Sequence, residues 1–182
     1  MIFPTKENSL LVAVDLQAKL LPVMADSENI IRRSEIMLRG VAEMGVDILV
    51  TEQYPRGLGN TLPALSTWLP DSAPVVEKSS FSVFGSPEFC RHLMSRKREV
   101  LIFIGVETHV CLLQSVLDAR SRGYEVIVTA DAVGSRKECE KLWALEAVKA
   151  AGAWVLSSEA VLFMLLRDSK NPAFKAVSGL IK

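Results

Sequence analysis

Short aliphatic runs alternate with helical patterns along this chain, and this alternation restricts its fold more than any other feature. Each run is apolar almost throughout, as expected of a strand covered on both faces of a parallel sheet. Parallel neighbours are joined by right-handed crossovers that place helices on both faces. The sequence therefore predicts an α/β fold of three layers, α/β/α, around a doubly wound, six-stranded parallel sheet. The expected strands are residues 10–14, 46–50, 74–78, 100–104, 126–129 and 154–156.

Helices are predicted from apolar spacing and from residues that begin or end helices. Ser86 followed by Pro87 is typical of a helix start, and Ser135 with Glu138 three residues later has the pattern of a capping box. Residues 51–74 show little periodicity, which predicts a long loop. Helices are expected at residues 29–44, 87–98, 108–122, 135–150, 158–166 and 171–181.

The composition argues against several classes of protein. The chain has 182 residues, and 21 Lys and Arg balance 21 Asp and Glu, so a surface that binds nucleic acid is not expected. No apolar run approaches the length of about 18 residues that spans a bilayer, and the first residues lack the pattern of a secretion signal. We expect one domain, residues 1–182, with no membrane or nucleic-acid partner. We expect it in the cytoplasm, with a mitochondrial or other intracellular location left open.

Cysteine content and charge carry two further expectations. Cys90, Cys111 and Cys139 are odd in number and far apart, which speaks against a disulfide framework and favours reduced thiols. A net charge of zero removes the long-range repulsion between copies, so we expect a homo-oligomer.

Reactive side chains follow three of the expected strands, at the edge where doubly wound sheets bind their ligands. Asp15 ends the first strand and Lys78 the third, and Cys111 lies in the first turn of the next helix, where the helix dipole favours a thiolate. Together they would form a base, a cation and a nucleophile. Taken singly, Cys111 is equally well explained as a buried apolar side chain, Asp15 as a residue that ties down a turn, and Lys78 as a side chain reaching solvent.

The chain also carries separated motifs that occur together in one known family. They are Val14-Asp15-Leu16-Gln17, Thr51-Glu52-Gln53-Tyr54-Pro55 with Gly57-Leu58-Gly59, Lys78 with Phe81-Ser82, Gly105-Val106-Glu107-Thr108-His109-Val110-Cys111, Asp131-Ala132-Val133, Ser158-Glu159 and Asn171-Pro172-Ala173-Phe174-Lys175. In this combination the sequence resembles the isochorismatase-like cysteine hydrolase superfamily, and within it most of all the isochorismatase domain-containing subfamily. The superfamily includes nicotinamidases and carbamoyl-sarcosine hydrolases. The similarity covers nearly the whole chain.

The resemblance implies a sheet of strand order 3-2-1-4-5-6, which puts Asp15 beside Cys111 where the order reverses. It also implies a catalytic triad of Asp15, Lys78 and Cys111, in which the aspartate is the base, the lysine orients it and the cysteine is the nucleophile. A cis peptide bond is expected between Val106 and Glu107. This bend would let the backbone N–H groups of Glu107 and Cys111 form an oxyanion hole.

The activity implied by the resemblance is hydrolysis of a C–N bond, in an amide or related group of a small molecule, through a thioester-type intermediate. No metal and no other cofactor is expected, because the paired histidines that hold a metal in nicotinamidases are missing after the second strand. Two alternatives remain, namely a catalytically silent oligomeric scaffold with the hydrolase fold and an isochorismate-type vinyl ether hydrolase. Candidate pocket residues, each of which is equally well explained by ordinary packing, are Gln17, Tyr54, Phe81, Phe84 and His109.

Overall fold

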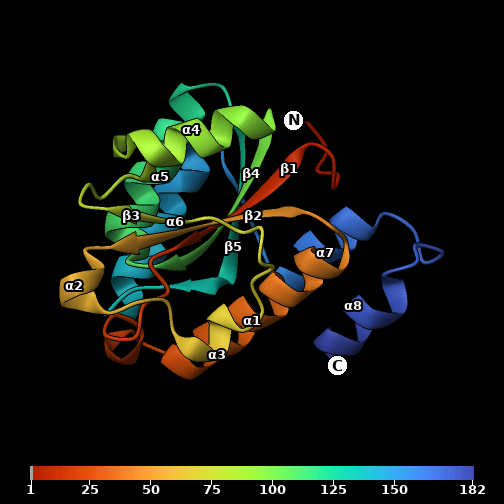
Figure 1. The fold of residues 1–182 in the computed structure, drawn as a ribbon, viewed down its shortest axis with the longest axis horizontal. Coiled ribbons are helices and arrows are strands. Elements are labelled where there is room, and N and C mark those ends of the chain that lie inside the picture. The colour runs from red at the N-terminus through yellow and green to blue at the C-terminus, as the bar shows by residue number, and fades with distance from the viewer. Residues whose placement is uncertain (1) are drawn as a thin grey trace.

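The structure, a computed structural model, describes residues 2–182 and is built around one parallel sheet (Figure 1). Its six strands follow the order β3-β2-β1-β4-β5-β6, and every neighbouring pair is parallel. The predicted α/β class and the strand order implied by the resemblance are both confirmed. The strands are β1 (Ser9–Val14), β2 (Asp47–Gln53), β3 (Val75–Lys78), β4 (Val100–Val106), β5 (Glu125–Gly134) and β6 (Trp154–Leu156).

The sequence of β1 is aliphatic because both faces of this strand are buried. Leu11 and Ala13 pack into the core on one side of the sheet, whereas Leu10, Val12 and Val14 pack into the core on the other side. Successive side chains of a strand point to opposite faces, so a central strand of a covered sheet needs apolar residues at every position. Full burial of one such Val or Leu side chain contributes about 1.5–3 kcal/mol to folding.

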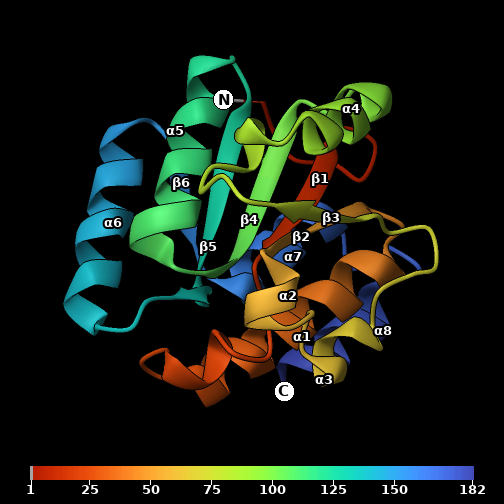
Figure 2. The same ribbon diagram turned by 60° about the vertical axis from the view of Figure 1, so that its left-hand side comes forward.

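Helices cover both faces of the sheet, as Figures 1 and 2 show from two directions. α4, α5 and α6 lie on one face, and α1, α7 and α8 lie on the other, while the short helices α2 and α3 connect β2 to β3. Within residues 2–182, no helix is both long and apolar enough to span a bilayer. The helices are α1 (Ser27–Glu43), α2 (Pro55–Leu58), α3 (Pro63–Ser66), α4 (Pro87–Arg96), α5 (Leu113–Ser121), α6 (Glu138–Ala150), α7 (Ser158–Leu166) and α8 (Phe174–Ile181).

The strand order reverses next to β1, and this position brings three strand ends together. Val14, the last residue of β1, is paired with Thr51 of β2 on one side and with Gly105 of β4 on the other. Gly105 has a φ of 133°, and a Cβ atom there would lie 2.0 Å from the carbonyl oxygen of Val14. Only glycine allows this close approach. Residues that follow these strands, including Asp15, therefore meet at one edge of the sheet.

The start of α6 differs from the sequence prediction. β5 extends to Gly134, so Ser135 stands at a strand end, and α6 begins at Glu138 with Lys137 before it and no side-chain cap. The predicted capping box is therefore wrong. The Ser135 hydroxyl instead lies 3.0 Å from Nδ1 of His109.

The predicted loop at residues 51–74 contains regular structure. β2 continues to Gln53, and two short helices, each with a proline in its first turn, follow it. The buried carboxylate of Glu52 anchors this segment, because its Oε1 accepts hydrogen bonds from the backbone N–H and the hydroxyl of Thr61 at 2.6 and 2.7 Å. Hydrogen bonds between polar side chains do not affect the spacing of apolar residues, so the sequence pattern could not predict them.

Candidate active site

Three strands at the reversal point are each followed by a non-glycine residue in the left-handed conformation. Asp15 follows β1 with a φ of 54°, Tyr54 follows β2 with a φ of 38°, and Glu107 follows β4 with a φ of 57°. Such conformations cost free energy and cluster at functional sites, because the surrounding structure must enforce them. Here they turn the chain sharply where the strands end, at one edge of the sheet.

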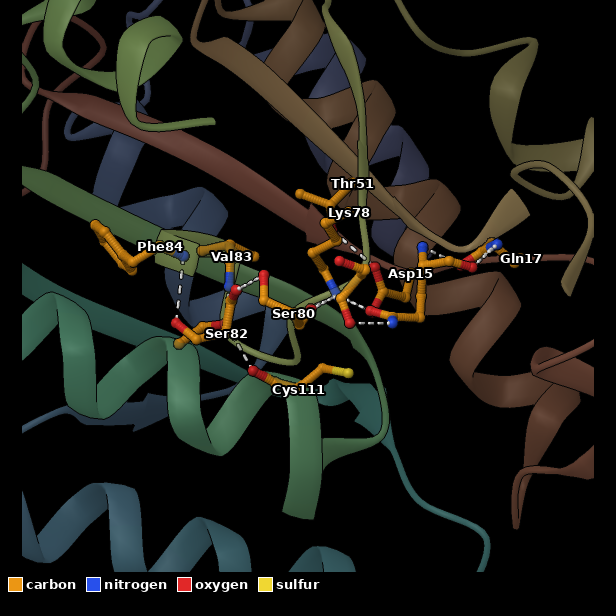
Figure 3. A network of polar contacts seen from close by, with 12 residues as sticks. Asp15, Gln17, Thr51, Lys78, Ser80, Ser82, Val83, Phe84 and Cys111 are labelled. Atoms are coloured by element: carbon orange, nitrogen blue, oxygen red, sulfur yellow. Dashed lines mark hydrogen bonds and ion pairs between the residues drawn. The ribbon is translucent and has the colours of Figure 1, made fainter. Parts of the chain in front are cut away.

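Asp15 is a fully buried carboxylate with a partner on each oxygen (Figure 3). Oδ1 accepts a hydrogen bond from the hydroxyl of Thr51 at 2.8 Å, and Oδ2 accepts one from Nζ of Lys78 at 2.7 Å. The Asp15 and Lys78 side chains are both 0% exposed, so their ion pair is shielded from water. A buried ion pair of this kind is costly to desolvate, which makes it weak evidence for stability and stronger evidence for chemistry.

The ammonium of Lys78 is held in one direction by its full set of hydrogen bonds. Besides Asp15, Nζ donates to Oε1 of Gln53 at 2.7 Å and to the carbonyl of Ser80 at 3.2 Å. An ammonium has three donors, and each of them has a partner here. Lys78 is therefore fixed as a cation beside Asp15, and its alternative reading as a side chain reaching solvent is wrong.

Cys111 lies on the π-helical turn Thr108–Leu112, which leads into α5. In Figure 3 its sulfur is directed towards Asp15 and Lys78, and the charges of both residues act on the pKa of the thiol. The carbonyl of Glu107 accepts hydrogen bonds from the backbone N–H groups of Val110 and Leu112, the residues on either side of Cys111. The structure thus brings the three predicted triad residues together from three separate strand ends.

Burial raises the pKa values of both Asp15 and Cys111. It raises the pKa of the Asp15 carboxyl, although the Lys78 charge and hydrogen bonds from Lys78, Thr51 and Cys111 oppose the rise. Burial also raises the pKa of the Cys111 thiol to about 12, and the adjacent Asp15 charge adds to this effect. The expected preference for a thiolate at the helix start is therefore wrong, because burial and the neighbouring Asp15 favour the protonated thiol. At neutral pH Cys111 is a thiol whose sulfur is directed towards Asp15.

The expected cis peptide bond between Val106 and Glu107 is also wrong. Throughout residues 2–182 the peptide bonds are trans. The chain turns after β4 through the left-handed backbone of Glu107, with φ 57° and ψ 52°, which avoids the about 3–4 kcal/mol that a non-proline cis bond costs.

Two of the five candidate pocket residues lie inside the protein. The Gln17 side chain is fully buried, with Nε2 donating to the carbonyls of Gln53 and Gly59 at 2.9 and 2.6 Å, and Oε1 accepting from the N–H of Gln53 at 2.7 Å. Phe84 packs edge-on against Phe89 in the core. Gln17 holds the strand ends in place and Phe84 fills the core, so ordinary packing explains both residues.

The other three candidates lie nearer the surface. Tyr54 and Phe81 are 61% and 53% exposed, and Nε2 of His109 lies 3.7 Å from Oε2 of Glu107. A hollow of about 360 Å³ opens beside the triad lysine, and a second hollow of about 230 Å³ opens beside His109. The first is lined by Tyr54, Pro55, Arg56, Glu77, Lys78 and Ser79. Cys111 itself is only 3% exposed, so its sulfur is covered in this conformation.

Several residues that support the triad were missed by sequence reasoning. Thr51 and Gln53 bond directly to Asp15 and Lys78, and Ser80 contributes only its carbonyl. Thr51 could have been found, because it is a polar residue at the end of a buried strand that pairs with β1. Among the described residues, no three His, Cys, Asp or Glu side chains gather closely enough to hold a metal ion. The absence of a metal and of any other cofactor stays a prediction.

Comparisons with known proteins point to one family. The family model described as isochorismatase domain matches residues 9–160. Isochorismatase domain-containing protein 2A of Mus musculus is 36% identical over 177 residues, which cover 97% of this chain and 84% of the mouse protein.

Solved structures give a consistent result. The structure of MAR1 ribonuclease from Caenorhabditis elegans shares 35% sequence identity with this chain at a TM-score of 0.94, and the match covers 99% of this chain and 92% of that one. The ycaC gene product from Escherichia coli, described as an octameric hydrolase of unknown specificity, is 23% identical with a TM-score of 0.93 over 100% of this chain and 90% of that one. At this lower identity the likeness concerns the fold alone.

Proposed function

The chain belongs to the isochorismatase family, and we propose that it is a cysteine hydrolase that cleaves a C–N bond, in an amide or related group of a small molecule. In this proposal Cys111 is the nucleophile, Asp15 is the general base and acid, and Lys78 orients Asp15. The observation that carries the proposal is the buried Lys78–Asp15 ion pair, 2.7 Å long, towards which the Cys111 sulfur is directed. Ordinary packing gives no reason to collect a carboxylate, an ammonium and a thiol in one buried place.

The first half of the reaction forms a thioester. The Cys111 sulfur attacks the carbonyl carbon as Asp15 takes the thiol proton, and the carbonyl oxygen becomes an oxyanion. When this tetrahedral intermediate collapses, the C–N bond breaks and Asp15 returns the proton to the departing nitrogen. A carboxylate with a raised pKa suits this work, because it binds a proton more strongly than an ordinary aspartate.

The second half releases the acid. A water molecule takes the place of the amine, Asp15 removes its proton, and the resulting hydroxide attacks the thioester carbon. The C–S bond then breaks and the proton on Asp15 returns to the sulfur of Cys111. One amide and one water become one acid and one amine, and the enzyme regains its starting state.

The developing oxyanion needs donors that are already in position. We assign this role to the backbone N–H groups of Glu107 and Cys111, which lie at the two ends of the turn that begins after β4. Fixed donors of this kind stabilise a transition state without reorganisation, and the loss of one costs about 10²–10³ in rate.

The low exposure of Cys111 sets a condition on the substrate. A side chain that is 3% exposed meets a ligand only after the groups over it move apart. The hollow that Lys78 lines measures about 360 Å³, and a hollow of this volume fits a small molecule.

The test is a panel of small amides, ureas, vinyl ethers and single-stranded RNA, assayed with the wild type and with Cys111→Ala. Release of ammonia or amine from at least one amide or urea, lowered by about 10³-fold or more in Cys111→Ala, is the expected result. Cleavage of vinyl ethers or RNA alone would contradict the proposal. RNA is included because the C. elegans relative is described as a ribonuclease.

A silent scaffold is the rival explanation, and the raised pKa of Cys111 fits it equally well. A scaffold needs no reactive group, so this explanation gives no reason for an ammonium of Lys78 that is held beside Asp15 by three hydrogen bonds. If the wild type cleaves nothing in the panel, the scaffold explanation stands and the hydrolase proposal fails.

Self-association remains a separate proposal. Leu142 and Trp143 of α6 are 53% and 65% exposed, and Trp154 of the neighbouring strand β6 is 44% exposed. Large apolar side chains that are exposed in this way favour association with another copy of the chain. Light scattering should give a mass that is a multiple of 20.0 kDa, and a single-chain mass at every concentration would contradict it.

A further inference from the structure

The segment of residues 79–85 leads from β3, the strand of Lys78, to α4, and it is hydrogen-bonded to α5, the helix that follows Cys111. Its first half is fixed on the Lys78 ammonium. The Ser80 carbonyl accepts a hydrogen bond from Nζ of Lys78, and the Ser80 hydroxyl donates to the carbonyl of Ser82 at 2.9 Å. A Cβ atom on Gly85 would lie 2.5 Å from the Ser80 side chain. The segment is therefore folded tightly on itself next to Lys78.

Ser115 of α5 connects the second half of this segment to Cys111. The Ser115 hydroxyl donates to the carbonyl of Cys111 at 2.6 Å and accepts from the backbone N–H of Val83 at 3.0 Å. Ser115 is 0% exposed, so water cannot replace either bond. A serine that bonds to the carbonyl four residues earlier is common in helices, but here that carbonyl belongs to the nucleophile and the same hydroxyl holds the segment that follows Lys78.

A second bridge lies one turn further along the same helix. The Ser82 hydroxyl donates to Oδ2 of Asp118 at 2.6 Å and accepts from the N–H of Phe84 at 3.2 Å. Asp118 is three residues after Ser115, so both bridges leave α5 from the same face. Figure 3 shows the resulting run of polar contacts from Asp15 and Lys78 through residues 80–84 to Cys111.

We propose that Ser115 is a positioning residue for the nucleophile, an inference that rests on the proposed function and deepens it. By holding the Cys111 carbonyl and Val83 together, its hydroxyl fixes the turn of the nucleophile relative to the segment that holds Lys78. The distance between sulfur and carboxylate thus depends on a side chain that touches neither. Small misplacement of a nucleophile lowers the rate steeply, because few bound geometries lead to reaction.

The test compares Ser115→Ala with Ser34→Ala, a matched control. Ser34 of α1 is also a helical serine that is 0% exposed, but its hydroxyl has no hydrogen-bond partner among the described residues. The two variants therefore delete the same atom at the same burial, and only one deletes the bridge. Ser115→Thr keeps the hydroxyl and serves as the conservative variant.

Two readouts are expected to separate the variants. With an amide or urea identified by the panel, Ser115→Ala should lose about tenfold in kcat while KM changes by less than about twofold. With iodoacetamide at about pH 8, Cys111 of Ser115→Ala should be alkylated faster by about threefold or more. Release of the turn exposes the sulfur and withdraws it from the Asp15 charge that raises its pKa. Ser34→Ala should match the wild type, and Ser115→Thr should recover most of both properties.

Peptide mass spectrometry assigns the alkylation to Cys111. The inference is overturned if Ser115→Ala and Ser34→Ala agree in alkylation rate within about twofold, or if kcat of Ser115→Ala equals that of the wild type. Failure of the proposed function looks different. In that case the wild type cleaves no member of the panel, and the alkylation comparison still decides whether Ser115 positions Cys111.

Discussion

Two ion pairs stand at opposite edges of the sheet and join the same kinds of charge at similar distances. Lys78 and Asp15 meet at the carboxyl ends of the strands at 2.7 Å, with both side chains 0% exposed. Arg98 and Asp47 meet where β2 begins, at 2.9 Å, with side chains 26% and 35% exposed. The second pair is partly exposed, with Nε and Nη2 of Arg98 both donating to Oδ2 of Asp47 at 3.1 and 2.9 Å, so it loses far less hydration than the first pair. The first carries a large desolvation penalty, so its presence is better explained by the chemistry of the thiol beside it.

The largest expected difference between the two edges is in activity. Asp15→Asn removes the proposed base while keeping the size of the side chain, so turnover of a panel amide should fall by about 10²–10⁴. Asp47→Asn makes the same change at the other edge and should leave turnover unaltered. Steady-state kinetics on both variants checks this. An Asp15→Asn variant with turnover close to that of Asp47→Asn would remove Asp15 from the mechanism.

The two ion pairs should also differ in how much they contribute to the free energy of unfolding. Lys78→Met leaves the Asp15 carboxylate buried without its cation, so the free energy of unfolding should fall by about 3–5 kcal/mol at neutral pH. Arg98→Gln breaks the partly exposed pair and should cost about 1 kcal/mol. Urea denaturation measures both. Equal losses in the two variants would mean that burial does not distinguish the pairs.

The dependence of stability on pH sharpens the contrast between buried and exposed groups. The pKa of Cys111 in the folded protein, about 12, lies above its ordinary value of 9.0. The protonated thiol therefore stabilises the folded protein fully below about pH 9, and this stabilisation is lost as the pH rises. Between about pH 9 and 11 the wild type should lose up to about 1.4 kcal/mol per pH unit more than Cys111→Ser. Cys139 is exposed, so Cys139→Ser should follow the wild type. Parallel curves for all three proteins would contradict the raised pKa.

The smallest effect concerns a single hydrogen bond. The Thr51 hydroxyl lowers the pKa of Asp15, so Thr51→Val should raise that pKa and move the acid limb of the profile of kcat/KM against pH to higher pH. The acid limb moves to higher pH because Asp15 can act as a base only after it has lost its proton. An unmoved acid limb would show that another group titrates there.

The sheet and the grouping of Asp15, Lys78 and Cys111 at one of its edges could be predicted, the sheet from strong local signals and the grouping from the motifs of a known family. Continuous aliphatic runs identified β1 and β4, Ser86 was correctly placed at the start of α4, where its hydroxyl accepts from the N–H of Phe89, and parallel strands bring their carboxyl ends to one edge. The motif resemblance supplied the pairing of Asp15, Lys78 and Cys111. The strands and the start of α4 needed only spacing and side-chain type.

The rest depended on contacts between distant segments. Ser135 has the sequence of a helix cap, but β5 continues through the preceding residues and leaves it beside His109. Gln17 has the composition of a pocket residue, but three backbone groups use its amide. The protonation of Cys111 depends on desolvation, which only the packed protein determines. The identity of a single residue does not reveal which distant residues it contacts in the folded protein.

The most direct test of the central claim is a search for the covalent intermediate. The wild type is mixed with a panel amide, quenched in acid within the first turnovers, and digested for peptide mass spectrometry. The proposal predicts that the peptide containing Cys111 gains the mass of the acyl group, that the gain disappears in Cys111→Ala, and that it accumulates when deacylation is slowed. Turnover of the amide with an unmodified Cys111 peptide at every time point would contradict it.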